Sequence, residues 1–128
     1  MKKGIAVLCI FVITILFGIF EITNVKKTLI TIEDMVFDLS LKYENSEDEI
    51  NIYYNEIADI KRYWHKSQTW LCFIFNHRDL STITDSLNRL SAYTKNNDFD
   101  NAICELELLK EFTSSSYHIL GFNLHNVL

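Results

Sequence analysis

The residues of this chain whose types could do chemistry are histidines, cysteines and clustered carboxylates. The run HRDL at residues 77–80 matches the start of a protein-kinase catalytic loop. That loop continues to an Asn four residues after the Leu, where this chain has Thr84. A kinase also needs a glycine-rich loop and a metal-binding Asp-Phe-Gly, which the sequence lacks. The four-residue match is therefore a coincidence and does not indicate phosphoryl transfer.

The histidines and carboxylates also lack the spacing of a metal site. No two histidines lie four residues apart, the spacing that places two imidazoles on one helical face. The acidic residues between 44 and 49 lack the alternating oxygen ligands and the central glycine of a calcium loop. No serine lies in a nucleophile elbow and no glycine-rich phosphate cradle is present. We expect no catalytic residue, no metal and no cofactor, and we do not expect an enzyme.

The apolar run from Gly4 to Phe20 is the clearest feature of the sequence. It contains no charge and follows Lys2 and Lys3. As a helix it is about 25 Å long, close to the shortest length that crosses a hydrocarbon core of about 30 Å. No small-residue cleavage step follows, which favours an uncleaved anchor over a secretion signal. We expect a single-pass membrane anchor at residues 1–22, with the following domain on the extracytoplasmic side.

The remainder of the chain has the composition of an all-α domain. The sequence contains no proline and three glycines, whereas strand architectures need such residues at their turns. We expect the transmembrane helix to continue as a stalk helix over residues 23–45. The transmembrane helix thus continues into a small antiparallel bundle of about three to four helices, with residues 46–128 as the bundle domain.

Apolar residues at steps of three and four predict which helical faces are buried. The stalk carries the stripe Ile22, Val25, Leu29, Ile32, Val36 and Leu39. A one-sided stripe requires a partner, either the downstream helices or a second copy. The other stripes are Ile50, Tyr54, Ile57, Ile60, Trp64, Leu71 and Ile74, then Leu80, Ile83, Leu87, Leu90 and Tyr93, and finally Phe99, Ala102, Ile103, Leu106, Leu109 and Phe112.

Polar residues predict where these helices begin. Ser46 and Glu49 fit a capping box for the second helix. Asp79 or Ser81 is expected to cap the third helix, and Asp98 the fourth. The serines at 114–116 are expected to loosen the last helix, after which the apolar residues of the C-terminus dock on the bundle.

The centre of the second helix is aromatic, with Tyr53, Tyr54, Tyr63, Trp64 and Trp70. Aromatic residues at helical spacing favour a core position, because each buries a large area. A second interpretation is a patch of Trp70, Phe73 and Phe75 that contacts a partner or the lipid headgroups.

Charge and cysteine content narrow the classes of partner. From Ile32 onward eight Lys and Arg face sixteen Asp and Glu, a net charge of minus eight. This acidic balance argues against nucleic acid, whose binding needs a basic patch.

Cys9 lies in the apolar run, while Cys72 and Cys104 are expected to be buried free thiols. A disulfide between the latter two stays open, because it depends on their distance.

These features together resemble a known family. The resemblance is carried by Trp64, Trp70, His77 and Arg89, with Leu87 and Leu90, and by the stretch NNDFDNAICELELLK. The chain resembles the bacterial membrane-anchored family catalogued as domain of unknown function 4363, found mainly in clostridia and related spore-forming bacteria. Members often have Trp where this chain has Phe99, and an acidic residue where it has Asn76.

The resemblance implies an anchored helical protein without an assigned activity. Such genes often lie beside one for a multi-pass membrane protein, which implies an accessory role for a membrane partner. We therefore expect an interaction module that binds a membrane protein or a second copy, with Trp64, Trp70, His77, Arg89 and Phe99 as candidate interaction or core residues. The alternative is a ligand- or peptide-sensing domain, with the ligand between helices near Trp64, Trp70 and His77.

Overall fold

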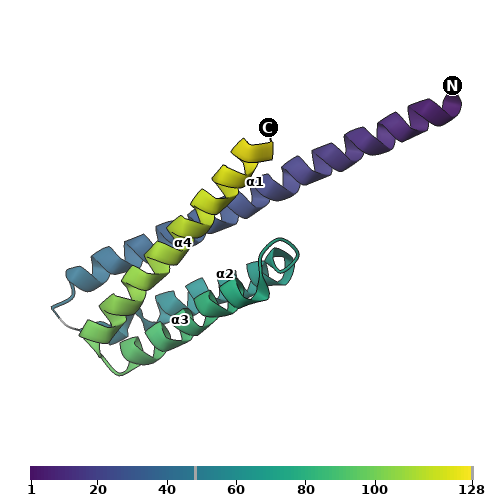
Figure 1. Ribbon diagram of the computed structural model, residues 1–128. Coiled ribbons are helices and arrows are strands. Elements are labelled where there is room, and N and C mark those ends of the chain that lie inside the picture. The colour runs from purple at the N-terminus through teal and green to yellow at the C-terminus, as the bar shows by residue number, and fades with distance from the viewer. Residues whose placement is uncertain (48, 128) are drawn as a thin grey trace.

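The structure, a computed structural model, describes residues 1–47 and 49–127, and their side chains as far as residue 115. These residues form four α-helices and one short 3-10 helix, joined by turns, and no strand occurs among them (Figure 1). The helices are α1(Lys2–Glu44), η1(Asn51–Tyr53), α2(Tyr54–Leu71), α3(His77–Lys95) and α4(Phe99–Val127). Successive helices run in opposite directions. The predicted all-α antiparallel bundle is confirmed.

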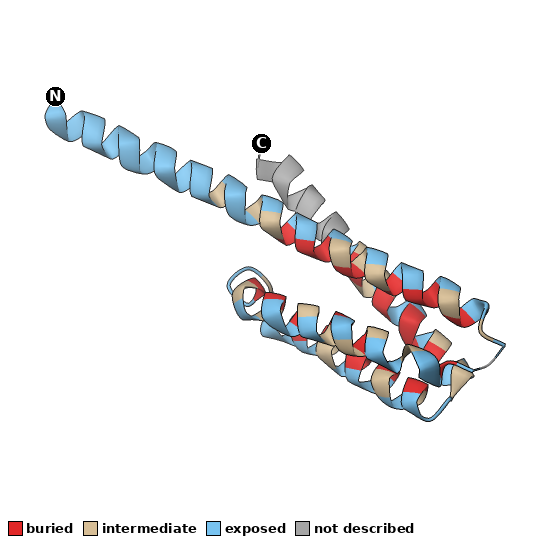
Figure 2. Cartoon of the chain, turned by 180° about the vertical axis from the view of Figure 1, so that it is seen from behind, coloured by how far each residue is buried: buried red, intermediate tan, exposed pale blue. Residues whose placement is uncertain are grey.

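Helix α1 is continuous, but its two halves have different surroundings. The large apolar side chains from Ile5 to Phe20 are 45–67% exposed, on all sides of the helix. Figure 2 shows this part of α1 extending beyond the bundle. From Val25 onward one face is buried, comprising Val25, Leu29, Ile32, Val36, Leu39 and Tyr43. The predicted stripe is confirmed, except that Ile22 is only half-buried.

The partner of this stripe lies within the same chain. Helix α4 packs along α1 and α3, while α2 packs against α3 and α1. Leu106 and Leu109 of α4 are fully buried and belong to one core cluster with Val25 and Leu39 of α1. Of the two partners considered for the stripe, the downstream helices therefore cover it. The segment expected to be a stalk thus contributes a wall of the bundle.

The capping box predicted at Ser46 and Glu49 is wrong. The Ser46 hydroxyl donates to the carbonyl of Tyr43 at 2.7 Å, and thus closes the end of α1. The free amides before α2 are bound from another turn: Asn97 Oδ1 accepts from Ile50 N at 2.8 Å and from the next amide at 3.3 Å. Asn97, almost fifty positions away in the sequence, therefore binds the free amides that the local spacing had assigned to Ser46.

The start of α3 also differs from the prediction at Asp79 or Ser81. Asn76 is the N-cap residue, and its side chain accepts from Arg78 N at 3.1 Å. The helix therefore begins before both predicted caps. For α4 the predicted cap is confirmed, because Asp98 Oδ1 accepts from Asn101 N at 3.4 Å.

The prediction that the serines at 114–116 loosen the last helix is wrong, since α4 continues to Val127. Just before them, the Thr113 hydroxyl donates to the Leu109 carbonyl at 2.9 Å, a bond that leaves the helix intact. The predicted docking of the C-terminal apolar side chains lies outside the described side chains.

Four other predicted positions are wrong because they lie near helix ends or on an outer face. Tyr54 begins α2 and Ile74 lies beyond its last residue, and both are exposed. Helical periodicity no longer decides burial where the helix has ended. The free thiols are confirmed, but Cys72 and Cys104 are exposed instead of buried.

Candidate functional site

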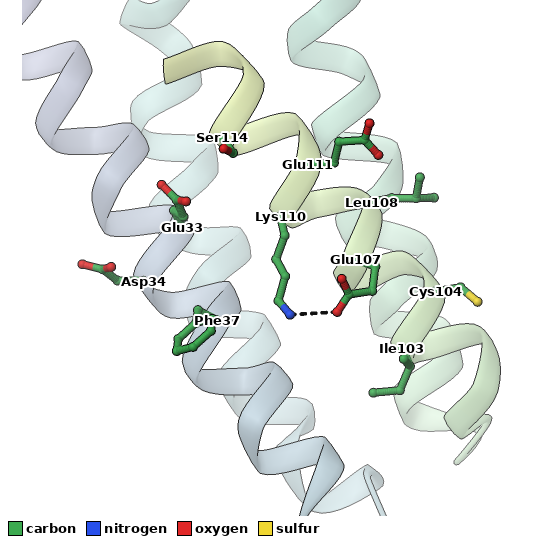
Figure 3. A pocket seen from close by; sticks show the side chains of 10 residues that line it. All are labelled: Glu33, Asp34, Phe37, Ile103, Cys104, Glu107, Leu108, Lys110, Glu111 and Ser114. Carbon is green, nitrogen blue, oxygen red and sulfur yellow. Dashed lines mark hydrogen bonds and ion pairs between the residues drawn. The ribbon is translucent and has the colours of Figure 1, made fainter. Parts of the chain in front are cut away.

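A groove with a volume of about 910 Å³ lies between α1 and α4. Residues from one face of each helix line it (Figure 3): Glu33, Asp34, Phe37, Ile103, Cys104, Glu107, Leu108, Lys110, Glu111 and Ser114. Both helices are held in place by the buried core beneath the groove. The groove is therefore a preformed surface feature.

The groove combines apolar surface with negative charge. Phe37 and Leu108 are both exposed, although they are large apolar side chains. Four carboxylates, from two residues of α1 and two of α4, stand against a single lysine in the lining: Glu33, Asp34, Glu107 and Glu111 against Lys110. Apolar contacts with an acidic rim suit a ligand that carries both apolar and basic groups.

Lys110 already has partners within the groove. Its Nζ lies 2.7 Å from Glu107 Oε1 and 5.7 Å from the centroid of the Phe37 ring. The lysine of α4 thus reaches toward α1 and contacts an aromatic face, an attractive arrangement for a cation. Among the described residues, the groove carboxylates Glu33, Asp34 and Glu111 form no ion pair.

A smaller hollow of about 450 Å³ lies between α1 and α2. Tyr63 and the half-buried Trp70 form the α2 side, and α1 contributes the polar residues Glu21, Asn24, Lys27 and Thr28. The hollow begins directly after Phe20, where the exposed apolar run ends. Trp70 therefore lines this hollow.

Arg89 belongs to a partly buried ion pair that joins α3 to α4. Its Nε donates to Glu105 Oε1 at 2.7 Å, and the Ser86 hydroxyl donates to Glu105 Oε2 at 2.6 Å. Burial alone raises the pKa of Glu105, but the bonds from Arg89 and Ser86 outweigh it, so that this pKa lies below its ordinary value. Both carboxylate oxygens of Glu105 accept hydrogen bonds, and the cluster joins α3 to α4. Its arrangement is structural.

A second polar pair joins α1 to α3. The buried Tyr43 of α1 hydrogen-bonds through its hydroxyl to Thr94 of α3. Burial raises the pKa of Tyr43 to about 12, although the bond to Thr94 lowers it in part. The phenol is therefore neutral at physiological pH and holds the two helix ends together.

Among the described residues, no group of three or more His, Cys, Asp or Glu lies close enough to hold a metal ion. The family model described as a domain of unknown function, DUF4363, matches residues 19–127. The chain belongs to this family. No curated protein and no solved structure matches the chain. The matched DUF4363 segment contains the amphipathic half of α1 and all three following helices.

The structure of the DUF4363 domain separates the five residues that the sequence brought together. Trp64 is 1% exposed, and its indole Nε1 donates to Thr84 Oγ1 at 2.8 Å, so it is a core residue. Phe99 is half-buried against the same core. His77 is exposed at the start of α3, and Arg89 serves the ion pair described above. Trp70 lines the hollow between α1 and α2.

Sequence patterns did not single out the groove. Phe37 and Leu108 each interrupt an otherwise polar face, and that interruption is the signal that could have been used. The two residues are 71 positions apart in the numbering, so their proximity to one groove follows only from the packing of α1 against α4.

Proposed function

We propose that the protein is a single-span, membrane-anchored interaction module, an accessory partner of another membrane protein. Helix α1 is the one described helix that is long and apolar enough to cross a membrane. Its apolar run has no cover within the described bundle, which supports a lipid environment for it. The proposal assigns the bundle to the extracytoplasmic side and assigns the protein no reaction.

The groove between α1 and α4 is the observation that carries this proposal. An amphipathic segment with basic residues would place apolar side chains on Phe37 and Leu108 and its charges beside Glu33 and Glu111. The groove lies on the helix that carries the apolar run, so a membrane protein in the same bilayer is a suitable source of such a segment. A second copy suits the groove less well, because residues from Ile32 onward carry a net charge of minus eight.

Photo-crosslinking in the native membrane tests the proposal. A photoreactive phenylalanine analogue replaces Leu108 in the groove, or Ile52, which is exposed in η1. We expect the analogue at position 108 to crosslink to a basic segment of a membrane protein, with a yield that falls as salt screens the charges. The analogue at position 52 should give no such product.

Charge reversal identifies the cause of any crosslink. Glu33→Lys with Glu111→Lys should remove the product, because both carboxylates lie in the groove lining. Glu44→Lys with Glu49→Lys makes the same change in net charge at exposed positions elsewhere, and should keep it. Equal yields from the two double variants, or crosslinks only to a second copy, would contradict the proposed partner.

The alternative, a ligand- or peptide-sensing domain, is supported by the hollow beside Trp70. Its lining of polar and aromatic side chains and its volume of about 450 Å³ suit a small ligand that carries both apolar and polar groups. Native mass spectrometry of the full chain in mild detergent tests this: a ligand that copurifies should be lost from Asn24→Leu. The bare mass of the unmodified chain would leave the interaction module as the better assignment.

A further inference from the structure

The turn between α2 and α3, residues 72–76, exposes apolar side chains at one end of the bundle. Phe73 is 86% exposed and, among described large apolar residues, only Met1 is more exposed. The turn is held by backbone hydrogen bonds, with Ile74 N donating to Leu71 O at 3.0 Å and Phe75 N to the same oxygen at 2.9 Å. Phe73 is thus presented by an ordered turn.

This turn lies at the end of the bundle where α1 enters its apolar run. Trp70, in the last turn of α2, shares the smaller hollow with Glu21, which directly follows Phe20. Figures 1 and 2 both show the α2–α3 turn at the end of the bundle that faces the N-terminal half of α1. The other two turns lie at the opposite end of the bundle.

The three turns differ in composition as they differ in position. Residues 45–49 read NSEDE and residues 96–98 read NND, as expected for turns in water. The stretch from Trp70 to Phe75 reads WLCFIF and contains no charged residue. Only the turn nearest the apolar run is itself apolar, although the same solvent would surround all three if the bundle stood free of the membrane.

We propose that the α2–α3 turn is a second membrane contact, with Phe73 and Ile74 in the boundary between headgroups and acyl chains. Trp70 then lies near the headgroups, where tryptophan side chains are enriched. This inference rests on the proposed anchor, because α1 sets the height of the turn above the bilayer. Two contacts orient the bundle, and with it the groove, relative to the membrane.

The three cysteines of the chain provide the test, since all are exposed and each samples one region. Full-length variants that keep only Cys9, Cys72 or Cys104, with serine at the other two, are spin-labelled in phosphatidylcholine nanodiscs. Collision with oxygen, which concentrates in lipid, is compared with collision with a water-soluble nickel chelate. We expect lipid exposure at Cys9, interfacial exposure severalfold above the aqueous level at Cys72, and aqueous exposure at Cys104.

The three labels separate the failure of this inference from that of the proposed function. A label at Cys9 in water would overturn the anchor and the turn contact together. A label at Cys9 in lipid, with Cys72 as aqueous as Cys104, would overturn the turn contact alone.

A paired substitution tests whether the apolar side chains cause the contact. Phe73→Ser with Ile74→Ser, in the variant that keeps Cys72, should return that label to the aqueous level while circular dichroism shows the same helix content and melting temperature. Both side chains are exposed, so the bundle tolerates their loss. An unchanged interfacial signal in this folded variant would overturn the proposal.

Discussion

The two halves of α1 form one uninterrupted helix and both are rich in apolar residues, yet they have opposite surroundings. In the first half Ile5, Phe11 and Phe20 are exposed, as are the large apolar side chains between them on every side. In the second half Val25 and Leu39 are fully buried, and polar residues predominate on the remaining face, with Phe37 and Leu41 among the exposed apolar exceptions.

The difference shows that the angular distribution of apolar residues decides what covers a helix. A stripe on one side is covered by a few neighbouring helices, here α4 and α2. A helix that is apolar on all sides needs cover all round, and a bundle of this size does not provide it. The family match starts at residue 19, so it includes the striped half and leaves out most of the other.

Aspartate substitutions in the two halves should produce the largest and most divergent effects. Val36→Asp places a carboxylate in the core and should cost on the order of 4–5 kcal/mol, which unfolds a small domain. Ile13→Asp should leave the bundle folded but weaken membrane insertion by about 3 kcal/mol. Circular dichroism in mild detergent measures the first effect, and membrane fractionation of cells measures the second.

The exposed neighbour Asp34 provides the control for position 36, because Asp34→Asn should leave both readouts unchanged. Equal loss of helix content in the Val36 and Ile13 variants would mean that the apolar run stabilises the bundle directly. That outcome would remove the contrast between the two halves.

Truncation of an aromatic side chain in each region should show the same contrast in the free energy of unfolding, with a smaller effect. Trp64→Ala should cost on the order of 3–5 kcal/mol, because the ring is buried in the core that the second half of α1 helps to form. Phe17→Ala, in the exposed half, should not change the free energy of unfolding. Urea unfolding of the full chain in detergent measures both. A Trp64 variant as stable as the Phe17 variant would contradict the core position.

Loss of the ion pair between Arg89 and Glu105 should have the smallest effect on the free energy of unfolding, and this effect should depend on pH. Because the pKa of Glu105 is lower in the folded chain than its ordinary value of 4.5, its contribution is complete above pH 4.5 and is lost as pH falls through the folded pKa. Glu105→Gln should therefore cost about 1–2 kcal/mol at pH 7 and progressively less below pH 4.5.

Urea unfolding at pH 7 and at lower pH measures this dependence. Glu107→Gln is the matched control, because it alters an exposed pair and should change the free energy of unfolding by less than about 0.5 kcal/mol. A Glu105 variant whose cost is the same at both pH values would show that the ion pair does not contribute through its charge.

Much of the fold could be predicted because its signals are local. Leu29 and Ile32 lie at helical spacing on one face, and this spacing predicted their burial without knowledge of the partner. Asp98 was identified as a cap because the group it binds lies three residues ahead. Asn97 was missed as a cap because the amides it binds, at Ile50 and Asn51, are distant in sequence.

The candidate site was less predictable for the same reason. Trp64 and His77 were grouped because both carry the resemblance to the family, whereas one lies in the core and the other in solvent. The groove depends on Phe37 and Leu108, which lie on different helices and line one cavity only after α1 and α4 pack.

The sequence by itself determined that the chain is helical, that residues 4–20 are apolar on all sides of a helix, and which faces of the later helices are buried. These properties depend on residues within a few turns of one another, through spacing and composition. Only the tertiary structure decided that α4 and α2 cover the stripe of α1, that Glu105 is paired, and that an acidic groove lies open between α1 and α4. Those features join residues far apart in the chain, and their positions are set by how the helices pack against one another.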